Sequence, residues 1–153
     1  MEYNTDYKLM KAQLEALIRD VPYETANFAN ASALIWQGLA DINWAGFYLM
    51  CDGMLVLGPF QGKPACTRIA LGRGVCGTAA QQDATQLVPD VHAFPGHIAC
   101  DCASNSEIVV PIHKNGAVYG VLDIDSPLLN RFSREDQSGL ESLVKVLEEM
   151  LSR

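Results

Sequence analysis

The sequence predicts a single α+β domain built around a mostly antiparallel sheet. Apolar residues recur at helical spacing near both ends of the 153-residue chain. Between these ends, short segments rich in β-branched and aromatic residues are separated by tight turns, which is typical of β-hairpins. A chain of this length buries one core without needing a second domain.

Two amphipathic helices are expected before the sheet, within about residues 5–39. The first covers Tyr7 to Arg19 and ends before Pro22, and its apolar residues at helical spacing are Leu9, Met10, Leu14, Leu17 and Ile18. The second runs from about Thr25 to Leu39, with an apolar side formed by Phe28, Ala31, Leu34, Ile35 and Leu39. Each helix therefore has one face to bury.

The central segment, about residues 43–126, changes to the spacing of strands. Two hairpins frame it: "NWAGFYLM" and "LVLGPF" flank the turn "CDG", and "EIVVPIHK" and "AVYGVLDID" flank the turn "NG". Between them we expect a short strand "TRIAL", a glycine-rich turn opening a short helix, "GRGVCGTAAQQ", and a strand "TQLV". Residues 91–105 are expected to be irregular.

A closing helix is expected over about residues 133–152. Ser133 is placed to cap its N-terminus, with Asp136 in the third helical position. Its apolar stripe consists of Leu140, Leu143, Val144, Leu147, Met150 and Leu151. The order of helices, strands and a final helix favours the α+β class.

Charge and composition argue against several classes of partner. Eighteen acidic and eleven basic residues give a net charge of −7, so no basic stripe is available to bind nucleic acid. No apolar run is long enough for a membrane span, and no secretion signal is visible, so a cytoplasmic location is expected. Cysteines number five, and in a reducing compartment disulfides are rare unless they are transient and catalytic.

The glycines at Gly72, Gly74 and Gly77 match the dinucleotide-binding pattern G-x-G-x-x-G, and Asp90 follows. A dinucleotide site needs this turn between two parallel strands. Hairpin signals flank it here, so the pattern favours glycines that ease a tight strand-to-helix turn.

The segment "HIACDCASNSE" raises the question of a metal site. It holds Cys100 and Cys102, with His92 and His97 nearby. A zinc site needs four well-placed ligands, usually from paired short spacings such as C-x₂-C. Because the chain offers C-x-C and no second close pair, we expect no metal site.

A catalytic thiol is the stronger interpretation of this segment. Such a thiol must be accessible, and if it is oxidised in turnover a second thiol must reach it. Cys100, in a polar irregular loop, suits the first role, and Cys66 or Cys76 suits the second. The alternative is that each is a buried structural cysteine. Cys51, beside a hairpin turn, is treated as incidental.

Two acids in "VLDIDS" supply a further chemical signal. Asp123 and Asp125 lie two apart on a strand and so point to the same face. An exposed face could carry them without function, but the apolar neighbours on both sides indicate partial burial, where one carboxyl tends to keep its proton. Glu107 begins the partner strand of the same hairpin and could lie near them.

Several long motifs together resemble one known family. They are "NWAGFYL", "LVLGPFQGKPAC", "GRGVCGTA", "DVHAFPGHIACDCASNSEIVVPI" and "GVLDIDS". They are similar to the free methionine-(R)-sulfoxide reductases, which are built on a GAF domain, and the resemblance covers the chain from about Phe28 to the last helix. It implies one GAF domain over residues 1–153, with N- and C-terminal helices on one side of a central antiparallel sheet.

The implied activity is the reduction of free methionine (R)-sulfoxide to methionine. By resemblance, it proceeds through a cysteine sulfenic acid and an intramolecular disulfide that thioredoxin reduces, with no metal or organic cofactor. A homodimer is also implied by the family. The rival interpretation is a GAF module that senses a small ligand without chemistry, although a passive binder would not need three thiols.

The resemblance also implies roles for single residues. Cys100 corresponds to the nucleophile, Cys66 to the resolving thiol and Cys76 to a third cysteine that could exchange further. Cys102 stands where the family pattern has alanine or serine, so a different disulfide with Cys100 or Cys66 is an alternative. The resemblance further implies three carboxylates that hold the substrate and assist the sulfoxide oxygen, Glu107, Asp123 and Asp125. It also implies two aromatic residues that line the pocket for the methyl-thio end of the substrate, Trp44 and Tyr48.

Overall fold

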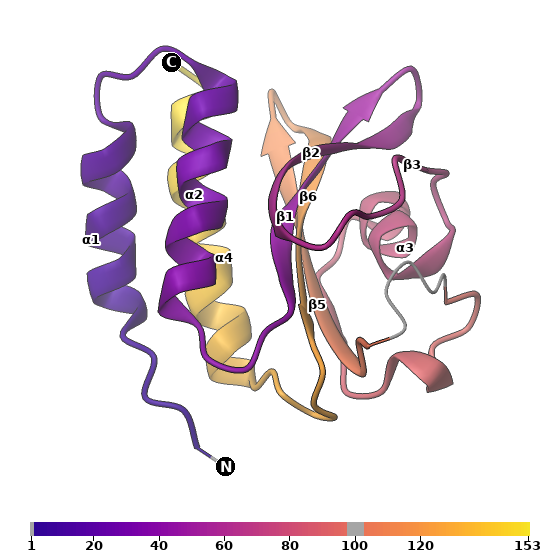
Figure 1. Cartoon of the computed structure of the whole chain (residues 1–153). Coiled ribbons are helices and arrows are strands. Elements are labelled where there is room, and N and C mark those ends of the chain that lie inside the picture. The colour runs from indigo at the N-terminus through magenta and orange to yellow at the C-terminus, as the bar shows by residue number, and fades with distance from the viewer. Residues whose placement is uncertain (1, 98–102) are drawn as a thin grey trace.

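The computed structural model of the chain describes residues 2–97 and 103–153 and has an α+β fold, as predicted (Figure 1). Its helices are α1 (Tyr7–Ile18), α2 (Glu24–Gly38), α3 (Gly74–Gln82), the 3₁₀ turn η1 (Val91–Ala93) and α4 (Arg134–Leu151). Its strands are β1 (Trp44–Cys51), β2 (Met54–Gly62), β3 (Arg68–Ile69), β4 (Gln86–Val88), β5 (Ser106–Lys114) and β6 (Ala117–Ser126). Among the described residues, no helix has both the length and the apolar character needed to cross a membrane.

The six strands form one antiparallel sheet in the order β3-β2-β1-β6-β5-β4. The two predicted hairpins, β1–β2 and β5–β6, lie side by side because β1 pairs with β6. This central pairing joins the first half of the sheet to the second. It also brings together residues that are about 80 positions apart in the sequence, such as Trp44 and Asp125.

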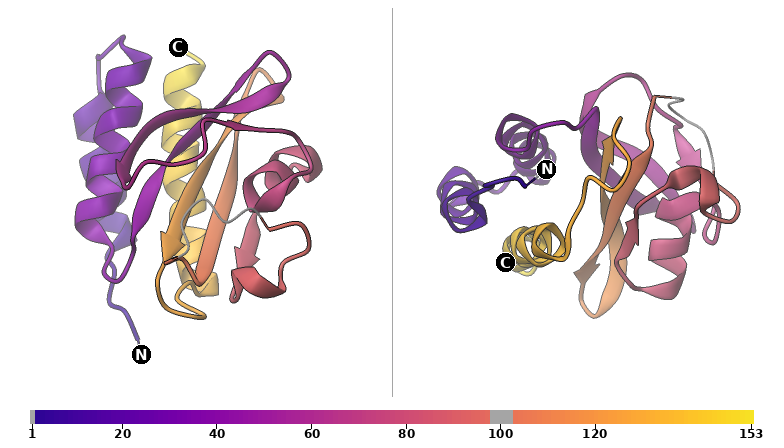
Figure 2. Two further views of the ribbon diagram at one scale, coloured as in Figure 1. Left: turned by 45° about the vertical axis from the view of Figure 1, so that its right-hand side comes forward. Right: turned by 90° about the horizontal axis from the view of Figure 1, so that it is seen from below.

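Helices α1, α2 and α4 form a layer on one face of the sheet, which confirms the expected packing of the terminal helices (Figures 1 and 2). Alternate residues of the central strands point into this layer, as the two-residue period of a strand requires. The main core on this face includes Phe28, Ile35, Phe47, Ile108, Leu122, Ile124, Leu140, Leu143 and Leu147.

Helix α3 and the loops around it cover the opposite face (Figure 2). The strand residues that alternate with those of the main core point toward α3. They form a smaller apolar cluster that includes Tyr48, Val109 and Val121. Both faces of β1, β5 and β6 are therefore covered. This explains why "YGVLDID" is apolar on both sides of the strand, since neither face lies open to water.

The ends of α4 and α3 follow local rules. Ser133 and Asp136 form the predicted capping box, in which the Ser133 hydroxyl accepts from the Asp136 amide and the Asp136 carboxylate accepts from the Ser133 amide. Within the first turn of α3, a Cβ added at Gly77 would stand 2.4 Å from the Ala70 carbonyl oxygen, so only glycine permits this close approach. The strands that flank α3 belong to an antiparallel sheet, and the glycine motif therefore serves a turn, as expected.

A buried ion pair ties the start of the chain to α4. The Arg131 side chain is 3.2 Å from Asp136, donates to the Ala40 carbonyl oxygen at 2.9 Å and stacks on the Tyr3 ring at 3.6 Å. Asp136 also accepts a hydrogen bond of 2.6 Å from the Tyr7 hydroxyl. These contacts join the N-terminal segment, the loop after α2 and the first turn of α4. The sequence pattern indicated none of these contacts.

We expect Asp136→Ala to lower the free energy of unfolding by about 3–5 kcal/mol, because it leaves the Arg131 charge buried without its partner. Urea unfolding followed by circular dichroism measures this loss. The matched control is Glu135→Ala, at an exposed neighbour in the same helical turn, which should cost about 0.5 kcal/mol. Equal losses in the two variants would show that the ion pair contributes nothing beyond the helix terminus.

Candidate active site

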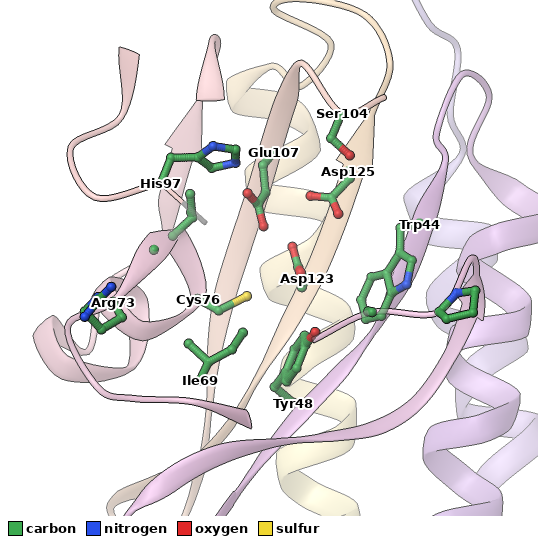
Figure 3. A pocket seen from close by; sticks show the side chains of 14 residues that line it. Trp44, Tyr48, Ile69, Arg73, Cys76, His97, Ser104, Glu107, Asp123 and Asp125 are labelled. Carbon is green, nitrogen blue, oxygen red and sulfur yellow. The ribbon is translucent and has the colours of Figure 1, made fainter. Parts of the chain in front are cut away.

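The register of the central strands gathers the predicted acids on the face covered by α3. Glu107 of β5 stands directly opposite Asp125 of β6, and Asp123 is one same-face position further along β6. On the other side of β6, Trp44 of β1 is paired with Asp125. Because paired residues share a face of the sheet, these side chains all project toward the same pocket (Figure 3).

The carboxyl groups lie deep in this pocket. Glu107 is 8% exposed and Asp123 is 5% exposed, while Asp125 is half-buried nearer the rim. The expectation of partial burial is therefore confirmed, and an exposed acidic face is excluded. Oδ1 of Asp123 has no hydrogen-bond partner among the described residues, so the pocket contains one unsatisfied acceptor aimed at whatever occupies it.

Burial decides the protonation of these acids. The pKa of Glu107 is raised well above 4.5, first by desolvation and then by the negative charges of Asp123 and Asp125. The pKa of Asp123 is also raised by desolvation, although hydrogen bonds from its neighbours oppose the rise. Glu107 is thus the carboxyl best suited to hold a proton near neutral pH.

Cys76 reaches the same pocket from the first turn of α3. Its sulfur and the nearest oxygens of Glu107 and Asp123 all lie within 4.8 Å of one another. A helix N-terminus favours a thiolate, but here desolvation and then the charge of Asp123 raise the pKa of the Cys76 thiol well above 9.0. The thiol is therefore neutral and a weak nucleophile in this state of the site.

Aromatic rings form the wall of the pocket opposite α3 (Figure 3). The Trp44 and Tyr48 rings are stacked with centroids 5.8 Å apart, and Phe60 stacks behind Trp44 at 5.2 Å. The Trp44 ring nitrogen donates to the Lys63 carbonyl oxygen at 3.1 Å, and the Tyr48 hydroxyl donates to the Cys66 carbonyl oxygen at 2.9 Å. The two predicted aromatics thus fix both the wall and the loop that carries Cys66.

The structure describes three of the five cysteines. Cys66 takes part in a disulfide, whereas Cys51 is an exposed free thiol and Cys76 a buried one. The predicted nucleophile Cys100 and the neighbouring Cys102 lie outside the described residues. Their roles therefore stay predictions.

Three further residues with polar or charged side chains line the pocket without having been assigned to it from the sequence: Arg73, His97 and Ser104. Arg73 precedes α3 within the glycine motif, and Ser104 accepts a hydrogen bond of 3.2 Å from the Asn43 side chain. The pKa of His97 is lowered by partial burial and then by the charge of His92. None carries a spacing signal, and only the folding of α3 and the loop before β5 against the sheet brings them here.

Comparison with known proteins gives two kinds of match. The family model "GAF domain" matches residues 13–150. A protein of Escherichia coli named free methionine-R-sulfoxide reductase is 53% identical over 146 residues, which cover 95% of this chain and 88% of that protein.

Solved structures match over almost the whole chain. The reduced form of fRMsr of Staphylococcus aureus has a TM-score of 0.96 and 51% identity, and the match covers 99% of this chain and 100% of that one. The same protein in complex with substrate has a TM-score of 0.94 and 50% identity, with 99% of both chains covered. The pocket described above therefore lies in a fold shared with a substrate-binding relative.

Glu107→Gln should change how stability depends on pH. Because the folded state holds the Glu107 proton above the ordinary pKa of 4.5, wild-type stability falls as pH rises from 4.5 until the folded carboxyl also ionises. The variant should lose part of this decline and be more stable than wild type in alkaline solution. Urea midpoints across a pH series measure the effect, with Glu149→Gln, an exposed change on α4, as the control. Parallel profiles for wild type and Glu107→Gln would contradict the assignment.

Proposed function

Because this chain belongs to the free methionine-(R)-sulfoxide reductase family of GAF-domain proteins, we propose that it reduces free L-methionine (R)-S-oxide to L-methionine. The observation that carries the proposal is the pocket itself. A wall of stacked aromatic rings faces a group of three carboxyls, one of which is suited to remain protonated. An amino acid with an oxidised thioether has an apolar end, a polar oxygen and an ammonium group that match these surfaces.

The substrate is oriented by this contrast between the walls. The methyl-thio end packs on Trp44 and Tyr48, whose rings provide a flat apolar surface. The ammonium group is held by the carboxylates, and the unsatisfied Oδ1 of Asp123 is the acceptor ready for it. The sulfoxide oxygen then faces the protonated carboxyl of Glu107.

The chemistry begins with Cys100 as the nucleophile. Its thiolate attacks the sulfoxide sulfur while Glu107, assisted by its neighbours Asp123 and Asp125, donates a proton to the oxygen. The protonated oxygen then moves from the substrate sulfur to the Cys100 sulfur as the S–S bond between the two breaks, which releases methionine and leaves Cys100 as a sulfenic acid. The two electrons that reduce the substrate come from this sulfur.

A second thiol then restores the enzyme. Cys66 attacks the sulfenic acid, water leaves and a Cys66–Cys100 disulfide forms, which a thioredoxin dithiol reduces by exchange. The disulfide at Cys66, together with the free state of Cys51 and Cys76, supports a resolving role for Cys66. The neutral buried thiol of Cys76 is less suited to attack. Cys102 is the remaining alternative to Cys100 or Cys66 in this disulfide.

The proposed function also implies an electron donor, a cellular location and an oligomeric state. We expect thioredoxin as the electron donor, a cytoplasmic location, where reductants maintain the thiols, and a homodimer, as the family implies. No metal or organic cofactor is needed for the reaction, because sulfur supplies the electrons and carboxyl groups supply the proton.

The direct test is a coupled assay on the purified chain. With thioredoxin, its reductase and NADPH present, free methionine (R)-sulfoxide should cause NADPH consumption and the (S) epimer should not. A peptide containing methionine sulfoxide serves as the control for the requirement for a free amino acid. Tight binding of the sulfoxide without NADPH consumption would instead favour the non-catalytic sensor module.

Two cysteine variants separate the proposed roles. Cys100→Ser should abolish the release of methionine even in a single turnover, because no nucleophile attacks the sulfoxide. Cys66→Ser should still release one equivalent per chain and then stop, since the sulfenic acid is not resolved. Quantifying methionine after mixing reduced enzyme with excess substrate measures both. Cys51→Ser, at an exposed position, is the control and should turn over like wild type. Equal loss in both test variants would overturn the assignment.

A further inference from the structure

The deepest part of the pocket combines one thiol and two carboxyls from three separate elements. Cys76 comes from α3, Glu107 from β5 and Asp123 from β6, and their ligand atoms all lie within 4.8 Å of one another. Each side chain is more than nine-tenths buried. Figure 3 shows the Cys76 sulfur and the two carboxyls pointing toward one another.

No cationic side chain among the described residues pairs with this group of acidic ligands. Among the described residues that line the pocket, the cationic or potentially cationic side chains are Arg73 and His97, and neither forms an ion pair with the cluster in the structure. Oδ1 of Asp123 is fully buried and has no hydrogen-bond partner within residues 2–97 and 103–153. An unsatisfied buried oxygen beside a thiol and a second carboxyl, both of which can release a proton when a metal binds, is a strong acceptor for a cation.

We propose that Cys76, Glu107 and Asp123 form a binding site for one thiophilic divalent cation of the Zn²⁺ or Co²⁺ class. This inference goes beyond the proposed reductase activity and does not depend on it.

The ligand set selects the class of ion. Sulfur and carboxylate oxygens bind Zn²⁺ at about 2.3 and 2.1 Å, which places tetrahedral ligands about 3.5 Å apart. Because the three atoms lie within 4.8 Å of one another, they must draw together by at most about 1.3 Å to bind the ion. Three protein ligands leave a fourth position for water, as in open zinc sites. Mg²⁺ and Ca²⁺ need six or more oxygens and do not fit a thiol-containing group of three.

Sequence spacing pointed to a different set of residues. From the sequence, the residues considered as metal ligands were Cys100, Cys102, His92 and His97, and their spacing argues against a zinc site. His92 in fact pairs with Asp90 at 3.1 Å and is exposed. The cluster proposed here spans residues 76 to 123, so no short motif reveals it.

Cobalt is the probe, because a Co²⁺–thiolate bond has a charge-transfer absorption band in the near ultraviolet. The full chain is prepared with Cys51, Cys66, Cys100 and Cys102 each changed to Ser, so that Cys76 is the sole thiol. Titration should give this band with saturation at one equivalent of Co²⁺. Adding Cys76→Ser should abolish the band. Absence of the band in the chain that retains Cys76 would overturn the proposal.

The carboxyl ligands are tested in the same single-thiol chain. Asp123→Asn should weaken Co²⁺ binding by about tenfold or more, since losing a direct ligand costs at least as much as losing an outer-shell partner. The matched control is Asp52→Asn, the same chemical change in an exposed turn, and it should leave the affinity unchanged. Equal affinities for the two variants would also overturn the proposal.

A measurement on the otherwise unaltered protein guards against misfolding of the multiple variant. Zn²⁺ should raise the melting temperature of the wild-type chain, because a ligand that binds only the folded state stabilises it. The rise should persist in Cys51→Ser and disappear in Cys76→Ser. A rise of the same size in Cys76→Ser would show that the metal binds elsewhere. The measurement contains neither sulfoxide nor reductant, so its outcome is independent of whether the chain is a reductase.

Discussion

The pairing register of β5, β6 and β1 is the constraint on which the site depends. Asp125 of β6 is paired with Glu107 of β5 on one side and with Trp44 of β1 on the other. One face of these three strands therefore presents Glu107, Asp125 and the aromatic wall. The intervening residues, such as Ile108 and Ile124, fill the main core beneath α2 and α4. A shift of one residue would send the carboxyls into that core and the isoleucines into the pocket. The hydrophobic core therefore fixes the candidate active site by fixing the register.

The ionisable groups buried in the pocket lower the stability of the folded protein. It buries Glu107, Asp123 and the Cys76 thiol close together, and each is most stable there without charge. The molecule tolerates this because the opposite face of the sheet is densely apolar, and because Tyr3 and Tyr7 hold the N-terminal segment to the buried Arg131–Asp136 pair. Burying acids at the bottom of a pocket is costly for folding, but the protonated form suits the proton transfer that the proposed reaction requires.

Much of the local structure could be predicted from the sequence. The capping box at Ser133, the two hairpins and the turn function of the glycine motif follow from short-range rules and occur as expected. Part of the site was also accessible, because Asp123 and Asp125 share a strand face and family motifs point to Glu107, Trp44 and Tyr48. Arg73, His97 and Phe60 were missed, since nothing in their spacing indicates which surface their segments meet. The ion pair of Arg131 with Asp136 escaped for the same reason.

The sequence by itself determined the periodicity of each element, the turns that connect them and, through its long motifs, the family to which the chain belongs. Only the tertiary structure decided that Cys76 lies against Glu107 and Asp123, although 31 residues or more separate it from them in the chain. It also decided their protonation. A pKa depends on how much water surrounds a group and which charges face it, and both are set by contacts between elements that the order of residues does not reveal.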